Sequence, residues 1–264
     1  MTNDIQSTFT FLNGRTVNRN GYGAMRLTGQ PGNFGPYADW KGGVALLRRA
    51  RELGINHIDT ARAYGPHDNE KIIADALRDE NGSYGDMFIA SKGGVEKTRD
   101  GITRDTSAAT MARHVDESLS NLGVDQIDLY YLHAPDGHTS VTESITALED
   151  ARKAGKIAMI GVSNVSRAQI EEAMQVAPIA AVQNRYSPTD ARDEEMEATI
   201  DWLDNQGIAF VSHGPLGAHP MKQGAAIDPK EALRGLLARS PNILVIPGTT
   251  TIAHLEENAA ALDS

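Results

Sequence analysis

The sequence predicts an α/β protein with a (β/α)8 fold, a TIM barrel, whose bottom is capped by an N-terminal β-hairpin. Three observations predict this. Short apolar segments alternate with helical segments eight times from residue 21 onward, on a nearly regular spacing. Glycines follow the expected helix ends, and capping residues precede several helix starts. An alternating segment around an Asn-Gly pair comes before the first unit. We expect a single domain over residues 1–264, with the hairpin segment in residues 1–20.

The elements are predicted in chain order as follows. Residues 9–17 alternate on both sides of Asn13-Gly14, which is the strongest short-range signal for a tight hairpin. Candidate strands then begin near Gly21, Ile55, Met87, Ile127, Lys156, Ile179, Ile208 and Ile243. The clearest helical segments are residues 41–53, 70–79, 107–121, 141–154, 166–176, 193–205, 229–238 and 252–262.

The residues at the ends of these helices support the assignment. Glycine just past a helix end suits a left-handed cap, and the four examples are Gly54, Gly123, Gly155 and Gly207. Polar side chains stand where N-caps belong, and proline suits a first helical position: these residues are Ser107, Ser166, Asp228 and Pro229.

A doubly wound open sheet is the alternative architecture. Such a sheet would carry a glycine-rich phosphate loop directly after its first strand. The best candidate is residues 28–35, in which Pro31 lies inside the turn and no helix begins at the glycines. We therefore interpret this segment as a surface loop that borders the mouth of the barrel.

Composition excludes several classes of function. The chain has 264 residues, of which 40% are hydrophobic and 23% charged, as in an ordinary globular protein. A net charge of −10 disfavours nucleic-acid binding and anionic membrane surfaces, although a local basic pocket for a phosphorylated ligand stays open. Without cysteine there is no disulfide, catalytic thiolate or cysteine-ligated metal. Residues 1–10 lack a signal-peptide pattern, and no apolar run approaches the roughly 20 residues of a membrane span, so we expect a cytoplasmic protein.

Ionisable residues end three successive predicted strands. Asp59 follows the second strand, Lys92 the third and His133 the fourth, while Tyr64 lies in the loop after Asp59. Singly, these could be a helix cap, a core histidine or a packed loop tyrosine. In a barrel, however, the carboxyl ends of the strands face the active-site mouth, so their joint placement predicts one shared site.

At these residues the sequence resembles the aldo-keto reductases. The resemblance covers essentially the whole chain in order, through the motifs Asp59-Thr60-Ala61 with Tyr64-Gly65, Ser91-Lys92-Gly93, Leu132-His133, Gly161-Val162-Ser163-Asn164, Val182-Gln183-Asn184, Ile246-Pro247-Gly248-Thr249 and Glu257-Asn258. Residues 21–25 and the Ile-Pro-Gly-Thr segment look like a bacterial branch that includes pyridoxal-reductase-like proteins.

The resemblance implies reduction of an aldehyde or ketone by hydride transfer from NAD(P)H. It makes Tyr64 the proton donor and His133 the residue that orients the carbonyl oxygen. A phenol titrates near 10, and a nearby ammonium lowers that pKa toward useful acid strength, which is the role implied for Lys92. Asp59 would keep Lys92 charged and oriented. Donors from Tyr64 and His133 would also stabilise the developing oxyanion.

The resemblance also implies a cofactor site for NADPH, with NADH as the alternative. Ser163, Asn164 and Gln183 would bind the nicotinamide carboxamide, and His213 would replace the usual stacking aromatic ring. Gly248 stands where many relatives have lysine and His254 where arginine is common, so backbone N–H groups at the last helix would hold the phosphate. The full expected set is Gly23, Met25, Ser163, Asn164, Gln183, His213, Gly214, Leu216, Gly217, Pro247, Gly248, Thr249, Thr250, His254, Glu257 and Asn258.

We expect an open substrate site. The chain stops at Ser264, directly after the last helix, and residues 217–228 are too short for an elaborate clamp over the cofactor. The candidates to line the site are Phe34, Tyr37, Trp40, Tyr186 and the loop of His138. The expected partner is a small carbonyl compound, with no nucleic acid or membrane, in a monomer or small homo-oligomer.

Two other functions stay open. A metal-dependent barrel hydrolase would want His-x-His at the first strand, which is absent, and the pair His133 and His138 has no accompanying carboxylates, so we expect no metal. A regulatory subunit of the same fold would bind the nicotinamide cofactor as a redox sensor beside a membrane channel. The complete set of four residues favours the enzyme, and turnover of 4-nitrobenzaldehyde distinguishes the two.

Overall fold

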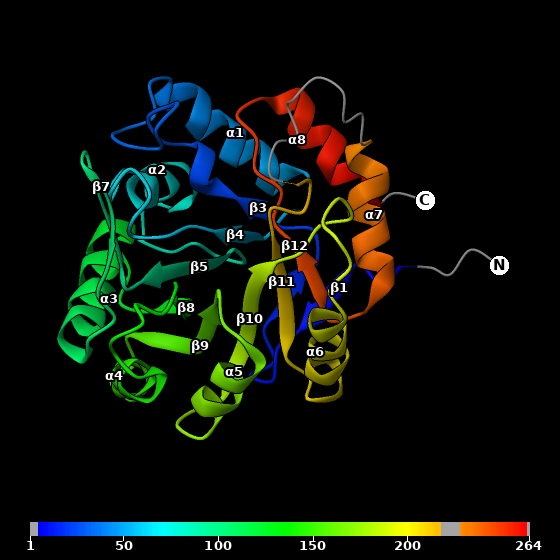
Figure 1. Cartoon of the computed structure of the whole chain (residues 1–264). Helices are drawn as coiled ribbons and strands as arrows, with labels where there is room; N and C mark the ends of the chain where they lie inside the picture. Colours follow the sequence, from blue (N-terminus) through cyan, green and yellow to red (C-terminus); the bar gives the residue numbers. More distant parts are fainter. Residues whose placement is uncertain (1–4, 218–227, 263–264) are drawn as a thin grey trace.

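The computed structural model describes residues 5–217 and 228–262, and within them eight parallel strands form one sheet that curls into a barrel (Figure 1). The predicted fold class is confirmed. In the order in which they pair, the strands are β3 (Tyr22–Gly23), β4 (His57–Asp59), β5 (Phe88–Gly93), β8 (Ile127–Leu132), β9 (Ile157–Ser163), β10 (Ile179–Arg185), β11 (Ala209–His213) and β12 (Ile243–Val245).

The barrel closes where β3 meets β12. The backbone N–H of Gly21 donates to the carbonyl of Val245 at 2.8 Å, and the N–H of Val245 donates to the carbonyl of Arg19 at 2.8 Å. A further bond joins the Gly23 N–H to the Pro247 carbonyl at 3.2 Å. This seam puts the ends of the first and last strands side by side at the mouth.

Helices surround the barrel and cover the outer faces of its strands (Figure 1). They begin and end close to the predicted positions, and the predicted cap Ser107 accepts a hydrogen bond from the Thr110 N–H. The helices are α1 (Trp40–Glu52), α2 (Asp68–Leu77), α3 (Ala108–Leu122), α4 (Val141–Lys153), α5 (Arg167–Met174), α6 (Glu194–Asn205), α7 (Pro229–Arg239) and α8 (Ile252–Ala259), with short 3-10 turns η1 (Ala24–Arg26) and η2 (Ala260–Leu262). None of the helices in the described part has the length and apolar character needed to cross a membrane.

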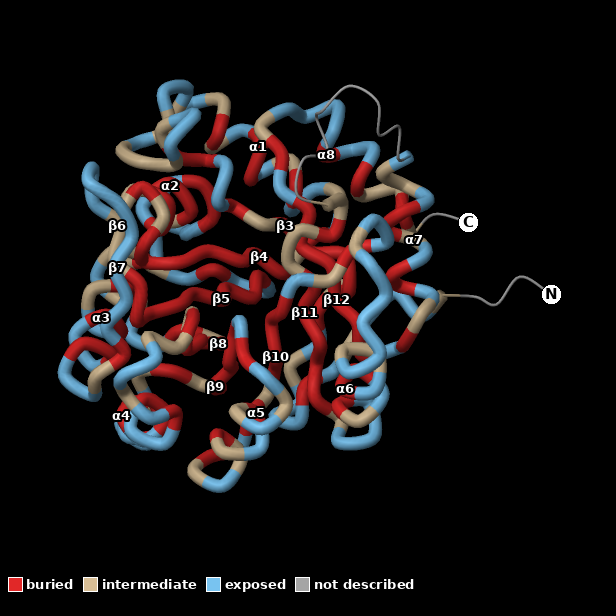
Figure 2. Tube along the Cα trace, in the orientation of Figure 1, coloured by how far each residue is buried: buried red, intermediate tan, exposed pale blue. Residues whose placement is uncertain are grey.

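The predicted N-terminal hairpin consists of β1 (Thr8–Thr10) and β2 (Thr16–Asn18), and it closes the bottom of the barrel. Its Phe11 ring stacks on Phe88 at 5.0 Å, and the Arg15 guanidinium donates to the Met87 carbonyl at 2.8 Å. Apolar side chains from the strands fill the space above, so the strands are buried along most of their length (Figure 2). The barrel is therefore a packed core with its chemistry confined to the upper end.

A second hairpin, which the sequence analysis did not predict, follows β5. It consists of β6 (Val95–Thr98) and β7 (Gly101–Arg104), paired antiparallel. The Lys97 ammonium donates to the carbonyl of Gly32, which ties this hairpin to the loop of residues 29–35. The turn itself is Arg99-Asp100, and the sequence contains a signal beside it, because Asp100-Gly101 is a pair that marks turns.

Candidate active site

Lys92 and Asp59 form a buried ion pair at the upper ends of the adjacent strands β5 and β4. The Lys92 ammonium donates to one Asp59 carboxylate oxygen at 2.5 Å and to the Thr60 carbonyl at 2.8 Å. The Gln183 amide donates to the other carboxylate oxygen at 2.7 Å. The lysine side chain is 1% exposed and the aspartate 3%. Because both carboxylate oxygens accept hydrogen bonds, the pair holds a fixed position below the cavity.

Tyr64 and His133 lie above this pair. The Lys92 ammonium is 5.5 Å from the centre of the Tyr64 ring, and the Tyr64 and His133 rings are 5.9 Å apart, edge to face. Burial raises the pKa of the Tyr64 phenol, while the Lys92 charge lowers it and the Asp59 charge raises it. Lys92 thus acts in the expected direction, but burial outweighs it and the net pKa is above 10. The phenol stays protonated at neutral pH, as a proton donor must.

His133 is a neutral imidazole in this environment. Burial lowers its pKa well below 6.5, and the charges of Lys92, His213 and Arg104 lower it further. Its Nδ1 is buried and has no hydrogen-bond partner among the described residues. The other ring nitrogen, Nε2, is therefore the one suited to donating to a ligand.

A polar group at the ends of β9, β10 and β11 lies beside the ion pair. Asn164 has a left-handed backbone with φ 57°, a conformation that asparagine tolerates. Its amide N–H2 donates to the His133 carbonyl and to Ser163 Oγ, both at 3.0 Å, and its oxygen is 3.1 Å from His213 Nε2. Burial lowers the pKa of His213 to about 4, so this ring too is neutral. Because the Ser163 hydroxyl and the Gln183 amide oxygen keep unused hydrogen-bonding capacity, the group fits a carboxamide ligand.

These side chains surround a cavity of about 580 Å³ at the mouth of the barrel. Its wall includes Asp59, Tyr64 and His133 together with eleven of the sixteen expected cofactor residues, which are Gly23, Met25, Ser163, Asn164, Gln183, His213, Gly214, Leu216, Gly217, Pro247 and Gly248. A Cβ atom at Gly23 would come within 2.5 Å of the Ile246 carbonyl oxygen, and one at Gly248 within 2.6 Å of the Gly23 carbonyl oxygen. Two backbones thus approach each other closely under the cavity floor, where side chains would force them apart.

The other expected cofactor residues lie outside this cavity, at or on α8. Thr249 is buried, and its hydroxyl oxygen accepts from the Thr251 N–H at 3.2 Å. Asn258 is buried and its carbonyl accepts from Asn20 at 2.7 Å, Thr250 is partly buried, and His254 and Glu257 are exposed. Much of the interval 217–228, for which we expected no elaborate clamp, is outside the described residues.

The four aromatic residues expected to line the substrate site do not line this cavity, and neither does His138. The Trp40 N–H donates to Asp75 at 2.9 Å, and Tyr37 packs on the core beside α1. Phe34 pairs through its backbone with Gly65. The Trp40 and Tyr37 side chains are thus occupied by hydrogen bonding and packing away from this cavity.

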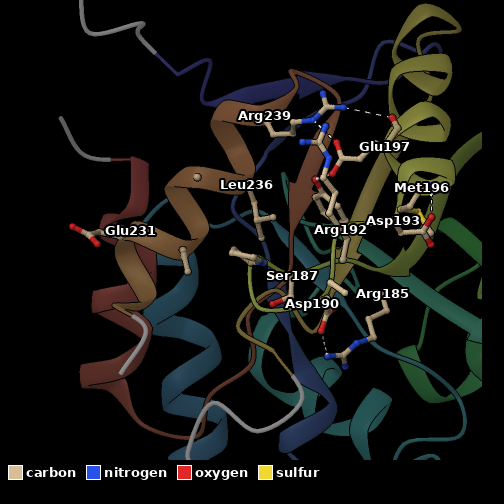
Figure 3. A pocket seen from close by; sticks show the side chains of 15 residues that line it. Arg185, Ser187, Asp190, Arg192, Asp193, Met196, Glu197, Glu231, Leu236 and Arg239 are labelled. Atoms are coloured by element: carbon tan, nitrogen blue, oxygen red, sulfur yellow. Dashed lines mark hydrogen bonds and ion pairs between the residues drawn. The ribbon is translucent and has the colours of Figure 1, made fainter. Parts of the chain in front are cut away.

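Tyr186 instead borders a second cavity, of about 670 Å³, between α6 and α7 (Figure 3). Its hydroxyl donates to Glu197 at 2.7 Å, and Glu197 also accepts from Arg239 at 2.8 Å. Arg185, at the edge of both cavities, pairs with Asp190 at 2.7 Å (Figure 3). The charged groups of this second cavity thus largely satisfy one another.

The sequence analysis missed several residues of the active-site cavity. They are Arg26, Asn33, Ala63, Val95, Lys97, Ile102, Arg104, Ala134, Arg185, Pro215 and Ile246. Four of them belong to the unpredicted hairpin β6–β7, for which Asp100-Gly101 was the available signal. In the part of the chain that the structure describes, no group of three or more His, Asp or Glu side chains could hold a metal ion.

The barrel, the buried Lys–Asp pair and the adjacent tyrosine and histidine define the chain as an oxidoreductase of one family. It belongs to the aldo/keto reductase family, whose sequence model matches residues 21–232. It is 40% identical to pyridoxine 4-dehydrogenase of Escherichia coli K12, over 97% of this chain and 92% of that protein. An uncharacterised oxidoreductase of Schizosaccharomyces pombe is 35% identical, over 93% of this chain and 81% of the relative.

Solved structures agree with this assignment. An aldo-keto reductase from Bacillus halodurans in its holo form superposes with a TM-score of 0.82 at 25% identity, covering 98% of this chain and 91% of that one. An aldo/keto reductase from Klebsiella pneumoniae in complex with NADP and acetate gives 0.80 at 25% identity, with the same coverage of 98% and 91%. The resemblance inferred from the motifs is thereby confirmed.

Proposed function

We propose that this chain reduces an aldehyde or ketone to the alcohol with NADPH as cofactor. The observation that carries the proposal is the meeting of Asp59, Lys92, Tyr64 and His133 at one cavity. The Klebsiella relative holds NADP, and the backbone and amide groups around this cavity suit such a ligand. What bound NADPH contributes to the reaction is the hydride for the carbonyl carbon.

The residues would divide the remaining work as follows. The Tyr64 hydroxyl and the neutral His133 Nε2–H would both donate to the carbonyl oxygen, which holds it in place and stabilises its growing negative charge. Tyr64 would then give up its proton to that oxygen. The phenolate left behind faces the Lys92 ammonium, 5.5 Å from the ring centre, whose charge stabilises it.

Asp59 and Gln183 would act on Lys92 rather than on the substrate. Asp59 holds the ammonium in position, and Gln183 satisfies the second carboxylate oxygen. Because Gln183 also faces the cavity, the same amide would connect the ion pair to the nicotinamide carboxamide. Ser163 and Asn164 complete that polar wall, and the neutral His213 ring would stack on the nicotinamide.

Phosphate binding would use backbone rather than cationic side chains. Gly214 and Gly217 have positive φ angles of 65° and 89°, and they border the cavity beside Gly248. Helix α8 starts just beyond, and its N-terminal N–H groups can hold an anion. We expect tighter binding of NADPH than of NADH, with His254 the nearest ionisable group on that helix.

The experiment is to follow NADPH absorbance with 4-nitrobenzaldehyde and with pyridoxal, which the name of the Escherichia coli relative suggests. The wild-type chain should turn over steadily. Tyr64→Phe should lose about 10²- to 10⁴-fold in kcat while tryptophan fluorescence still reports NADPH binding. Full activity in that variant would refute the role of Tyr64. Tight NADPH binding without turnover by the wild-type chain would instead indicate a cofactor-binding regulatory subunit.

A further inference from the structure

The active-site cavity is positively charged although the protein is acidic. The whole chain carries a net charge of −10. The ionisable groups in the cavity wall that carry charge at neutral pH are nevertheless Arg26, Lys97, Arg104 and Arg185, with Asp59 as the single carboxylate. Asp59 is already paired with Lys92. A recess with an excess of one sign of charge concentrates ligands of the opposite sign.

In the described part of the chain, Arg104 and Arg26 are the two cavity cations whose guanidinium groups are unoccupied, and Arg26 lies in η1, directly after β3 and next to the β12 end. Lys97 donates to the Gly32 carbonyl, and Arg185 pairs with Asp190 at 2.7 Å. Among the described residues, no hydrogen bond or ion pair engages the Arg104 guanidinium. The Arg104 charge also contributes to lowering the pKa of His133, so the guanidinium acts on the part of the cavity next to the proton donor.

The pairing of β6 and β7 explains why Arg104 faces inward. Val95 pairs with Arg104, and Lys97 pairs with Ile102, so these four side chains share one face of the hairpin. All four line the cavity. Glu96 lies on the opposite face. It forms ion pairs with Arg62 and Arg113 at 3.4 and 3.0 Å and accepts a hydrogen bond from His114 Nε2 at 3.1 Å, and the contacts with Arg113 and His114 anchor the hairpin to α3.

Arg104 lies away from the expected phosphate side of the cofactor. Backbone groups of residues 214–217 and 247–250 border the β11 and β12 ends, whereas the hairpin follows β5. Around the closed barrel, β8, β9 and β10 separate β5 from β11, and β4 and β3 separate it from β12; the label β7 stands across the barrel from β12 (Figure 1). The apolar side chains Val95, Ile102 and Ala134 line the cavity around Arg104. This part of the wall is therefore left for the substrate.

We propose that the cavity selects carbonyl substrates that carry an anionic group, a carboxylate or a phosphate monoester, and that Arg104 binds that group. The inference rests on the proposed carbonyl reduction. Tyr64 and His133 would hold the carbonyl oxygen, the apolar wall would cover the body of the substrate, and the guanidinium would donate two parallel hydrogen bonds to the anion. Arg104 is thus a specificity-determining residue and takes no part in proton transfer.

The test compares two aldehydes that differ in charge, 4-formylbenzoate and its methyl ester, in steady-state reduction with NADPH. In Arg104→Gln, kcat/KM for 4-formylbenzoate should fall about tenfold, mainly through KM, because the lost contact is a solvent-accessible charge-assisted hydrogen bond. Reduction of the ester should be unchanged. Arg99→Gln is the matched control, since Arg99 is an exposed cation on the same hairpin that does not line the cavity. Arg99→Gln should leave kcat/KM unchanged for both aldehydes.

A second pair of substrates, pyridoxal and pyridoxal 5′-phosphate, identifies the anion. A loss in Arg104→Gln that is larger for the phosphate ester than for 4-formylbenzoate indicates a phosphate site, and the reverse indicates a carboxylate site. Either result supports the proposal. Added salt should weaken the wild-type preference for the charged member of each pair, because the Arg104 guanidinium is exposed to solvent.

Three results would overturn the proposal. Equal effects of Arg104→Gln on charged and neutral substrates would mean that the residue supports the hairpin rather than an anion. Weaker NADPH binding by the same variant, measured as a larger dissociation constant, would assign Arg104 to the cofactor site. In both cases the wild-type chain still reduces the methyl ester, and the proposed carbonyl reduction stands. If the wild-type chain binds NADPH but reduces none of the four aldehydes, the proposed function fails, and this inference fails with it.

Discussion

Replacement of the buried Lys92 should show how strongly the Lys92–Asp59 ion pair contributes to the free energy of unfolding. Lys92→Met keeps the length of the side chain but leaves the Asp59 carboxylate buried at 3% exposure, with the Gln183 amide as its remaining hydrogen-bond donor among the described residues. Breaking a buried pair on one side costs about 3–5 kcal/mol, because the remaining charge has lost its partner but not its desolvation penalty. We expect a similar loss of stability for Asp59→Asn, which leaves the Lys92 ammonium buried without its carboxylate partner.

The double variant should be much less unstable than the sum of the two single variants. With both charges gone, no unpaired ion is buried, so we expect a coupling free energy of about 2 kcal/mol. The assay is urea unfolding of the wild-type, single and double variants at neutral pH. The matched control is the exposed pair Lys156–Asp116, 2.6 Å apart with side chains 42% and 56% exposed, where Lys156→Met should cost below about 1 kcal/mol.

Activity should not follow stability in this series. The double variant avoids part of the summed loss of stability but lacks the ammonium that faces the Tyr64 phenolate, so its carbonyl reduction should stay as low as that of Lys92→Met. Additive losses in the double variant, or a Lys92→Met no less stable than Lys156→Met, would refute the account of the buried pair. Turnover in the double variant clearly above that of Lys92→Met would refute the account of its chemistry.

Three further predictions concern other parts of the barrel. His57 is fully buried with neither ring nitrogen hydrogen-bonded, and burial lowers its pKa from 6.5 to about 4. Because the unfolded chain binds the proton at a higher pH than the folded chain, the free energy of unfolding should fall by about 3 kcal/mol as the pH drops from 6.5 to 4. Urea unfolding at a series of pH values measures this dependence, and His57→Leu should reduce it. Gly248→Ala would put a Cβ 2.6 Å from a facing carbonyl and should weaken NADPH binding in a fluorescence titration, whereas Gly235→Ala on α7, with open space around it, should leave binding unchanged. Phe11→Ala should lower the free energy of unfolding by about 3–5 kcal/mol, and Leu12→Ala, at a side chain 76% exposed, should change it little; equal effects would contradict the packing of the barrel bottom.

The repeating elements of the barrel could be predicted because their signals are local. Ser107 caps α3 through a contact within one turn, and Gly123 ends it at φ 65°. The strand ends gave Asp59, Lys92 and His133, since the topology of the barrel brings every carboxyl end to one face. The hydrophobic periodicity and the capping residues were nearly sufficient to predict the repeating strands and helices of the barrel.

The substrate side of the cavity depends on long-range contacts that no local pattern carries. Trp40 and Tyr186 were expected among the residues that line an open substrate site. Each instead bonds to a carboxylate on a helix, at Asp75 and Glu197, and such a partner is not visible in a linear sequence. Arg104 was missed for the opposite reason, because nothing in its neighbours distinguishes a charge that faces the cavity from one that faces solvent.

The seam between β3 and β12 would couple cofactor binding to the closure of the barrel. Tyr22, on one side, donates to the Thr249 carbonyl on the other at 2.6 Å, across 227 positions of sequence. Contacts of such long range form late, since the whole intervening chain must first be ordered. A ligand held by Gly23 and Gly248 would span this junction and stabilise only the closed ring. Bound NADPH would then stabilise the closed barrel, and amide hydrogen exchange at the β3–β12 seam would slow as the fraction of protein with bound NADPH rises.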